Sequence, residues 1–212
     1  GDISNLDNSG TPVAFICDGD TRGVKASLII DHNLGSDELT WPDPTSQVVL
    51  AGSKFTISRS EVIKQRRLRE SFEENSPLRV LFVAGGADFN EAAIAIARVL
   101  VLAAIPLDIH FITDESQGAL ITKMEFGEGT RVSWSSPSTG MLPLAAQSDI
   151  VISAAGTSAW DFVTIGIPAA YFAVVGNQVA SLARIEGAGI GVNLGSLEEI
   201  VNDPSAALNR LT

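Results

Sequence analysis

Three short segments of the sequence combine small residues with carboxylate or amide side chains. Each follows an apolar run typical of a buried strand and precedes a segment with a helical pattern. They are LFVAGGADFNE at 81–91, VISAAGTSAWD at 151–161 and FAVVGNQVAS at 172–181. A turn with almost no side chains lets a ligand approach the backbone, and the free N–H groups at the start of the next helix attract an anion. Such strand–turn–helix segments are suited to holding a phosphate.

The second of these segments carries the most specific pattern. Ala155, Gly156, Thr157 and Ser158 would open a helix whose unpaired N–H groups, with two hydroxyls, form a nest suited to a diphosphate. Asp161 lies one helical turn further on, where a carboxylate can accept two hydrogen bonds from a ribose diol, as an acid does in dinucleotide-binding folds. A simpler explanation is that Asp161 only complements the dipole of its own helix. Both explanations stay open on the residue types alone.

The other two segments repeat the design with less specificity. Gly85 and Gly86 would let a ligand approach the backbone, and Asp88 can cap the helix that follows. Their spacing matches neither a GxGxxG fingerprint nor a Walker loop, so a tight strand-to-helix turn explains them equally well. Asn177 and Gln178 begin a helix and would point two amides into the same crevice, although Asn177 can also be a plain N-cap. Together, the three turns predict a nucleotide-type ligand.

No pair of side chains is spaced as a nucleophile and its base. His32 follows a strand in IIDHNLG and is one candidate for a catalytic role, with Asn177 as another. Cys17 and His110 fit a buried core better than a site. We predict neither a metal nor a cofactor, because the acids near strand ends are better suited to capping turns: Asp18, Asp20 and Asp31.

Composition narrows the class of protein. The chain has 212 residues, 45% of them hydrophobic, which is enough for a sizeable core. Its net charge of −11 argues against nucleic-acid binding, which needs a basic surface. The longest apolar run, 94–105, is interrupted by Arg98 and is too short to span a bilayer, and no secretory signal is visible. The sequence is therefore expected to belong to a cytoplasmic protein.

The order of apolar runs predicts the domain organisation. From residue 78 to 212, strands alternate with helices, which indicates an α/β domain with a Rossmann-like, doubly wound parallel sheet. Ligands of such sheets bind beyond the carboxyl ends of the strands, where the strand order reverses. Residues 61–77 form a charged segment that we interpret as a linker helix. Residues 1–60 hold only a few strands, which is too little for an independent doubly wound domain.

Four stretches occur in an order that resembles a known family. They are LIIDHNLG, VVLAGSKFTISRSEV, LRVLFVAGGADFNEAA and LAAQSDIVISAAGTSAWDFVTIGIPAAYFAVVGNQ. This order is similar to that of the UDP-sugar hydrolase of pseudaminic acid biosynthesis and of its spore-coat polysaccharide biosynthesis relatives. The last stretch also resembles the C-terminal half of the UDP-GlcNAc transferase that makes lipid II.

The resemblance implies a GT-B-like architecture with a UDP-sugar bound between two Rossmann-type domains. It implies that residues 1–60 are a remnant of the N-terminal one of these domains. It implies that Gly85, Gly86 and the turn 156–158 lie near the diphosphate, and that an acid contacts the ribose. Asp161 stands where those families usually have Glu. Asn177 and Gln178 match an amide pair that orients the sugar.

One part of the family pattern is missing. The hydrolase carries its catalytic histidine in a Gly-His-x-x-Arg type of loop at the start of its N-terminal domain, and nothing in this sequence matches that loop. We therefore expect this chain alone to be inactive, with a sheet edge that a missing N-terminal segment, a partner or a second copy would cover. Three hypotheses remain: part of a UDP-sugar hydrolase, part of a GT-B glycosyltransferase, or a nucleotide-sugar-binding module without catalysis.

Overall fold

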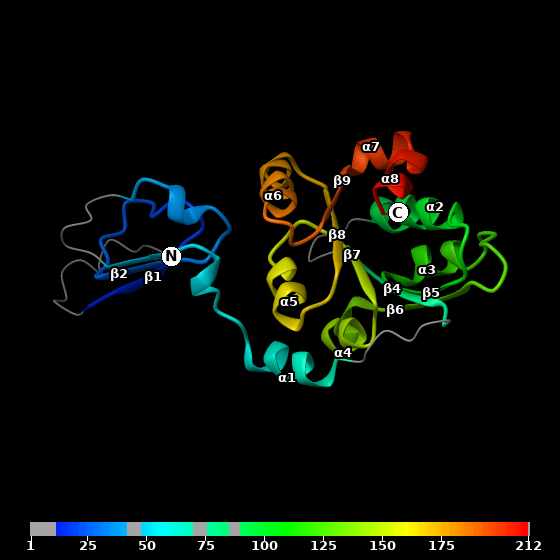
Figure 1. Cartoon of the computed structure of the whole chain (residues 1–212), viewed down its shortest axis with the longest axis horizontal. Coiled ribbons are helices and arrows are strands. Elements are labelled where there is room, and N and C mark those ends of the chain that lie inside the picture. The colour runs from blue at the N-terminus through cyan, green and yellow to red at the C-terminus, as the bar shows by residue number, and fades with distance from the viewer. Residues whose placement is uncertain (1–11, 42–47, 70–75, 85–89, 212) are drawn as a thin grey trace. The chain divides into compact units, whose positions relative to one another are not determined.

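The computed structural model describes residues 12–41, 48–69, 76–84 and 90–211 (Figure 1). By its internal contacts the chain divides into two compact units, the first ending at Ile57 and the second beginning at Ser58. The predicted domain bounds at residues 60 and 77 differ from this division, because the segment that we interpreted as a linker helix contributes to the core of the second unit.

The first unit is built on a small parallel sheet. Its three strands lie in the order β1-β2-β3, with β1 at Ala14–Ile16, β2 at Leu28–Asp31 and β3 at Val48–Ala51. Two short 3-10 helices follow β2 and β3, namely η2 (Ser36–Glu38) and η3 (Ser53–Phe55). The fully buried Asp31 accepts hydrogen bonds from the backbone N–H of Gly19 at 2.6 Å and of Asn33 at 2.9 Å. This carboxylate therefore ties together the turns that follow β1 and β2.

The second unit contains a six-stranded parallel sheet in the order β6-β5-β4-β7-β8-β9. From β4 the chain moves outward through β5 to β6, then crosses back to β7 on the other side of β4. This reversal confirms the Rossmann-like, doubly wound α/β fold that the alternation of strands and helices predicts. The strands are β4 (Leu78–Val83), β5 (Leu107–Ile112), β6 (Arg131–Ser135), β7 (Ile150–Ala154), β8 (Ala169–Ala173) and β9 (Val192–Ser196).

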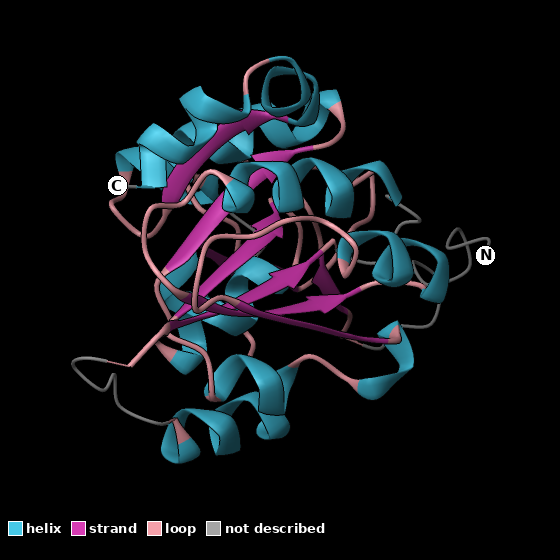
Figure 2. Ribbon diagram, turned by 90° about the vertical axis from the view of Figure 1, so that its right-hand side faces the viewer, coloured by secondary structure: helices cyan, strands magenta, loops and turns pink. Residues whose placement is uncertain are grey.

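Helices cover both faces of this sheet, which Figure 2 shows as a layer of strands between helices. One face carries α2 (Asn90–Val101), α3 (Glu115–Ile121), α7 (Leu197–Asn202) and α8 (Pro204–Leu211). The other carries α1 (Ser60–Leu68), α4 (Leu142–Ala146), α5 (Ser158–Ile165) and α6 (Gly176–Gly187). A parallel sheet covered on both faces needs strands that are apolar on both sides, which explains the continuous apolar runs in the sequence.

Strand β4 illustrates how one strand serves two cores. Val80 and Phe82 pack on the side of α2, whereas Leu81 and Val83 pack on the side of α5. The ring of Phe82 lies 5.4 Å from that of Phe111 in β5, measured between centroids. In the strand order, β4 and β7 are the two middle strands of the sheet.

Helix α1 belongs to the second of these cores. Its Val62 is fully buried in the same cluster as Phe162 of α5, and the helix packs against α4 and α5. The predicted linker helix covers residues 61–77, whereas α1 ends at Leu68, and residues 70–75 lie outside the described residues. In the part of the chain that the structure describes, no helix is both long and apolar enough to cross a membrane.

Candidate functional site

The three segments singled out in the sequence follow β4, β7 and β8, which are neighbours in the sheet. Val83 of β4 is in register with Ser153 of β7, and Ala154 of β7 with Phe172 of β8. Because the strands are parallel, their carboxyl ends lie at one edge of the sheet, beside the point where the strand order reverses. Gly85, Gly86 and Asp88 follow β4 in the sequence and lie outside the described residues.

The second turn, residues 155–157, follows β7 and carries only small side chains. The buried Ala155 donates its N–H to the carbonyl of Phe172 at 2.9 Å, which anchors the turn to β8. Gly156 and Thr157 are exposed, and Ser158 is the first residue of α5. No described atom lies within 4 Å of the place where a Cβ on Gly156 would stand. The turn thus leaves open space at the start of α5, where the N–H groups of Ala159 and Trp160 donate to the carbonyls of Gly156 and Thr157 at 3.1 Å and 3.2 Å.

The length of α5 follows from its sequence. The helix ends at Gly166, which adopts a left-handed conformation with φ 83 and donates its N–H to the carbonyl of Phe162 at 2.9 Å. Pro168 comes two residues later and cannot continue a helix. The eight residues of α5 therefore place Asp161 near the end of the helix that faces the turn.

Asp161 makes an ion pair that the sequence does not indicate. Its Oδ2 accepts a hydrogen bond from Nη2 of Arg59 at 2.7 Å. The side chain of Asp161 is only 16% exposed, whereas that of Arg59 is 63% exposed, so the guanidinium lies on the solvent side of the carboxylate. One residue earlier, the hydroxyl of Ser58 lies 2.8 Å from that of Thr164. The residues that lead into α1 are therefore held on α5 by two side-chain contacts.

One of the two amide side chains in the third turn, that of Gln178, bonds to backbone N–H groups next to it. The side-chain carbonyl of Gln178 accepts the backbone N–H of Val174 at 2.8 Å and that of Val175 at 3.4 Å. This oxygen caps the start of α6, so only the NH₂ end of the amide is left for a ligand. Asn177 lies in the first turn of α6, and its side chain is outside the described residues.

The predicted catalytic candidate of the first unit stands apart from these turns in the sequence. His32 directly follows β2 and is half-buried, beside the turn that Asp31 organises. The side-chain amide of Asn33 donates to Oδ1 of Asp18 at 2.8 Å, so this carboxylate also serves the turns. Burial, and then the charge of Asp31, raise the pKa of the Cys17 thiol. Cys17 is therefore poorly suited to act as a nucleophile.

His110 makes contacts on the sheet itself. Its Nδ1 lies 2.9 Å from the hydroxyl of Ser133 and its Nε2 lies 2.8 Å from that of Ser135, both in β6. Burial lowers the pKa of His110, against the opposing effect of Asp108. The neutral imidazole thus connects two strands through both ring nitrogens. Among the described residues, no group of three His, Cys, Asp or Glu side chains is arranged to hold a metal ion.

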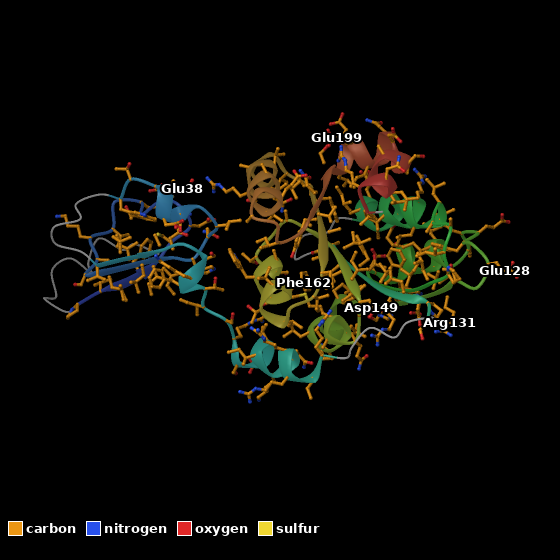
Figure 3. All side chains as sticks on the ribbon, in the orientation of Figure 1. Glu38, Glu128, Arg131, Asp149, Phe162 and Glu199 are labelled. Carbon is orange, nitrogen blue, oxygen red and sulfur yellow. The ribbon has the colours of Figure 1, made fainter. Side chains whose placement is uncertain are left out.

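A cleft of about 760 Å³ lies at the other side of α6, along strand β9. It runs between α6 and the last two helices, where Figure 3 labels Glu199 on α7. None of the residues predicted from the sequence as a site contributes to this lining: Val179, Leu182, Ala183, Glu186, Gly191, Val192, Asn193, Gly195, Ser196, Glu199 and Arg210.

Comparison with solved structures identifies the fold. MurG of Acinetobacter baumannii superposes with a TM-score of 0.59 at 14% identity, over 87% of this chain and 55% of that protein. UGT71G1 of Medicago truncatula, solved with UDP-glucose, superposes with a TM-score of 0.53 at 13% identity, over 88% of this chain and 45% of that protein. No protein-family model and no curated protein matches the sequence.

These structural neighbours are GT-B glycosyltransferases, so the fold of this chain is GT-B-like. At this level of identity the likeness is one of fold. The chain spans about half the length of the solved structures that it matches.

Proposed function

We propose that this chain is the nucleotide-sugar-binding part of a GT-B glycosyltransferase that uses a UDP-sugar as donor. The observation that carries the proposal is the position of the turn 155–158 and of Asp161 at the reversal of strand order. In open α/β sheets, ligands bind at that position. A neighbour of the same fold, UGT71G1, was solved with UDP-glucose.

In this proposal each turn has a separate task. The diphosphate binds the first N–H groups of α5, with Thr157 and Ser158 adding hydroxyl donors. Asp161 accepts hydrogen bonds from the ribose, and the NH₂ group of Gln178 donates to the sugar. Because the whole chain carries a net charge of −11, these local donors, rather than a basic surface, must offset the charge of the ligand.

Binding of UDP to the whole chain, measured by calorimetry, tests the proposal. We expect the wild type to bind UDP and Asp161→Ala to bind it about ten- to a hundredfold more weakly, because hydrogen bonds to a charged group are lost. The matched control is Glu128→Ala, which removes the same charge from an exposed turn before β6. Absence of binding at millimolar UDP, or equal affinity in Asp161→Ala and wild type, would contradict the proposed site.

A second candidate function is hydrolysis of the UDP-sugar. The order of the four sequence stretches that resemble the hydrolase of pseudaminic acid biosynthesis favours it. Product analysis with the complete natural protein separates the two candidates. A glycosyltransferase moves the sugar to an acceptor and leaves UDP, whereas the hydrolase releases the free sugar and UDP into water.

A further inference from the structure

The strongest unassigned contact near the candidate site lies at the start of the second unit. The first unit ends at Ile57, and the next two residues are both fastened to α5. Ser58 meets Thr164 and Arg59 meets Asp161, at 2.8 Å and 2.7 Å. Asp161 and Thr164 are three residues apart on a helix, so they present their side chains on the same face. We name Ser58 and Arg59, with these two contacts, the latch.

The latch and the proposed ribose site share a carboxylate. Asp161 would accept the ribose hydroxyls, yet one of its oxygens already accepts from Arg59, and little of the side chain faces solvent. The exposed guanidinium of Arg59 lies over that carboxylate. A diol that approaches Asp161 from solvent must therefore move Arg59 aside to contact both carboxylate oxygens.

Replacing the Arg59–Asp161 ion pair by hydrogen bonds from a ribose diol costs little energy. An ion pair with one partner largely in solvent contributes little to stability, since water can replace the bond. A ribose diol offers two donors to the carboxylate in place of one guanidinium bond. The contact between Ser58 and Thr164 is a single neutral hydrogen bond, which adds little to the hold on α5.

We propose that the latch is displaced by the nucleotide: binding of the ribose to Asp161 releases Arg59 and loosens the hold of residues 58 and 59 on α5. This inference rests on the proposed function. It adds a regulatory consequence, because occupancy of the nucleotide site changes how firmly residues 58 and 59 are held on α5.

The first test compares UDP affinity in Arg59→Ala with that of the wild type. Removing the competitor should tighten UDP binding about two- to fivefold. The matched control is Arg67→Ala, which removes an identical charge from an exposed position on α1, the helix that follows Arg59, and should leave the affinity within twofold of wild type. With Asp161→Ala as background, Arg59→Ala should produce no gain, because the shared carboxylate is absent.

The second test uses 2′,3′-dideoxy-UDP, which lacks the diol. If the ribose hydroxyls displace Arg59, the gain in Arg59→Ala should disappear with this analogue. Hydrogen exchange of the wild type with and without UDP gives an independent readout, in which amides around residues 58–60 should exchange several-fold faster when UDP is bound.

The outcomes separate this inference from the proposed function. If the wild type does not bind UDP, the proposed function fails. If the wild type binds UDP but Arg59→Ala binds more weakly, Arg59 is a direct contact of the nucleotide and the latch is wrong. If UDP binds and Arg59→Ala behaves like Arg67→Ala, or if UDP slows exchange at residues 58–60, the latch is equally overturned.

Discussion

At the scale of single residues, an ion pair fixes the starts of the two strands at the centre of the sheet. Nη2 of Arg79 lies 2.8 Å from Oδ1 of Asp149, and its Nε lies 3.1 Å from Oδ2. The backbone N–H of Arg79 also donates to Oδ2, at 2.9 Å. Figure 3 labels Asp149 beside α4. Burial raises the pKa of Asp149, but the hydrogen bonds from Arg79 outweigh it, and the net effect is a lowered pKa.

Asp149→Ala should lower the free energy of unfolding by about 2–3 kcal/mol at neutral pH, because it leaves a partly buried guanidinium and an N–H without their acceptor. The folded pKa is below the unfolded value of about 3.9, so the contribution is present above that pH and is lost as the pH falls through the folded pKa. Urea unfolding at pH 7 and at pH 3 measures the difference, which should shrink at the lower pH.

Asp108→Ala is the matched control for this prediction. Asp108 pairs with Arg131 at 2.7 Å, but both side chains are exposed, so its loss should cost less than about 1 kcal/mol. Equal losses in the two variants would show that the backbone hydrogen bond and the burial of Asp149 add nothing.

At the scale of elements, the fit of β9 against β8 depends on a residue without a side chain. A Cβ on Gly191, just before β9, would stand 2.6 Å from Cε2 of Tyr171 and 3.0 Å from the carbonyl oxygen of Ala169. Both neighbours belong to β8, and Tyr171 is fully buried. Burial raises the pKa of its hydroxyl far above the usual range. Because Tyr171 is packed in the core, its ring has little freedom to move away from an added Cβ.

Gly191→Ala should destabilise the protein by about 1–3 kcal/mol through overpacking against Tyr171. Gly187→Ala is the control, because no described atom lies within 4 Å of its Cβ position at the end of α6. In a helix the same change should instead stabilise by about 0.4–1 kcal/mol. Thermal unfolding of both variants gives the two signs, and a stable Gly191→Ala would contradict the fit between β8 and β9.

The strands and helices were largely predictable from the sequence. Apolar runs that end at small residues predicted β4, β7 and β8 with the helices after them, because buried parallel strands have a strong local pattern. The pattern from Leu197 to Leu211 predicts a single terminal helix, and this is wrong in one respect. The structure divides the segment into α7 and α8, because Pro204 has no backbone N–H with which to continue the helical hydrogen bonds.

The side chains of the candidate site were less predictable than its backbone. Arg59 and Asp161 are separated by 102 residues, and no local pattern links them. Gln178 was expected to orient a sugar, but its carbonyl satisfies backbone N–H groups four residues or fewer away. Both contacts depend on which polar group is nearest after folding, which residue type and spacing do not specify.

At the scale of the whole molecule, the two units have separate cores. Ile29 is fully buried in the first unit, in a cluster with Cys17 and Ala26. Phe82 is fully buried in the second unit, with its ring 6.2 Å from that of Phe172. The cluster of the first unit shares no residue with the clusters of the second.

We therefore expect two transitions in a calorimetric scan. Phe82→Ala should weaken only the transition of the larger unit, by about 3–5 kcal/mol, and Ile29→Ala only that of the smaller one, by about 2–5 kcal/mol. A single transition that both variants shift together would show that the units unfold as one.

The strand order also has a consequence for the time course of folding. Arg79 and Asp149, which bring β4 beside β7, are 70 residues apart in the chain, whereas β4 meets β5 through a single short helical crossover. Closing the longer loop costs more chain entropy before any contact rewards it. The junction of β4 and β7 at the centre of the sheet should thus be among the last parts of the sheet to form, so the carboxyl ends of these two strands come together late.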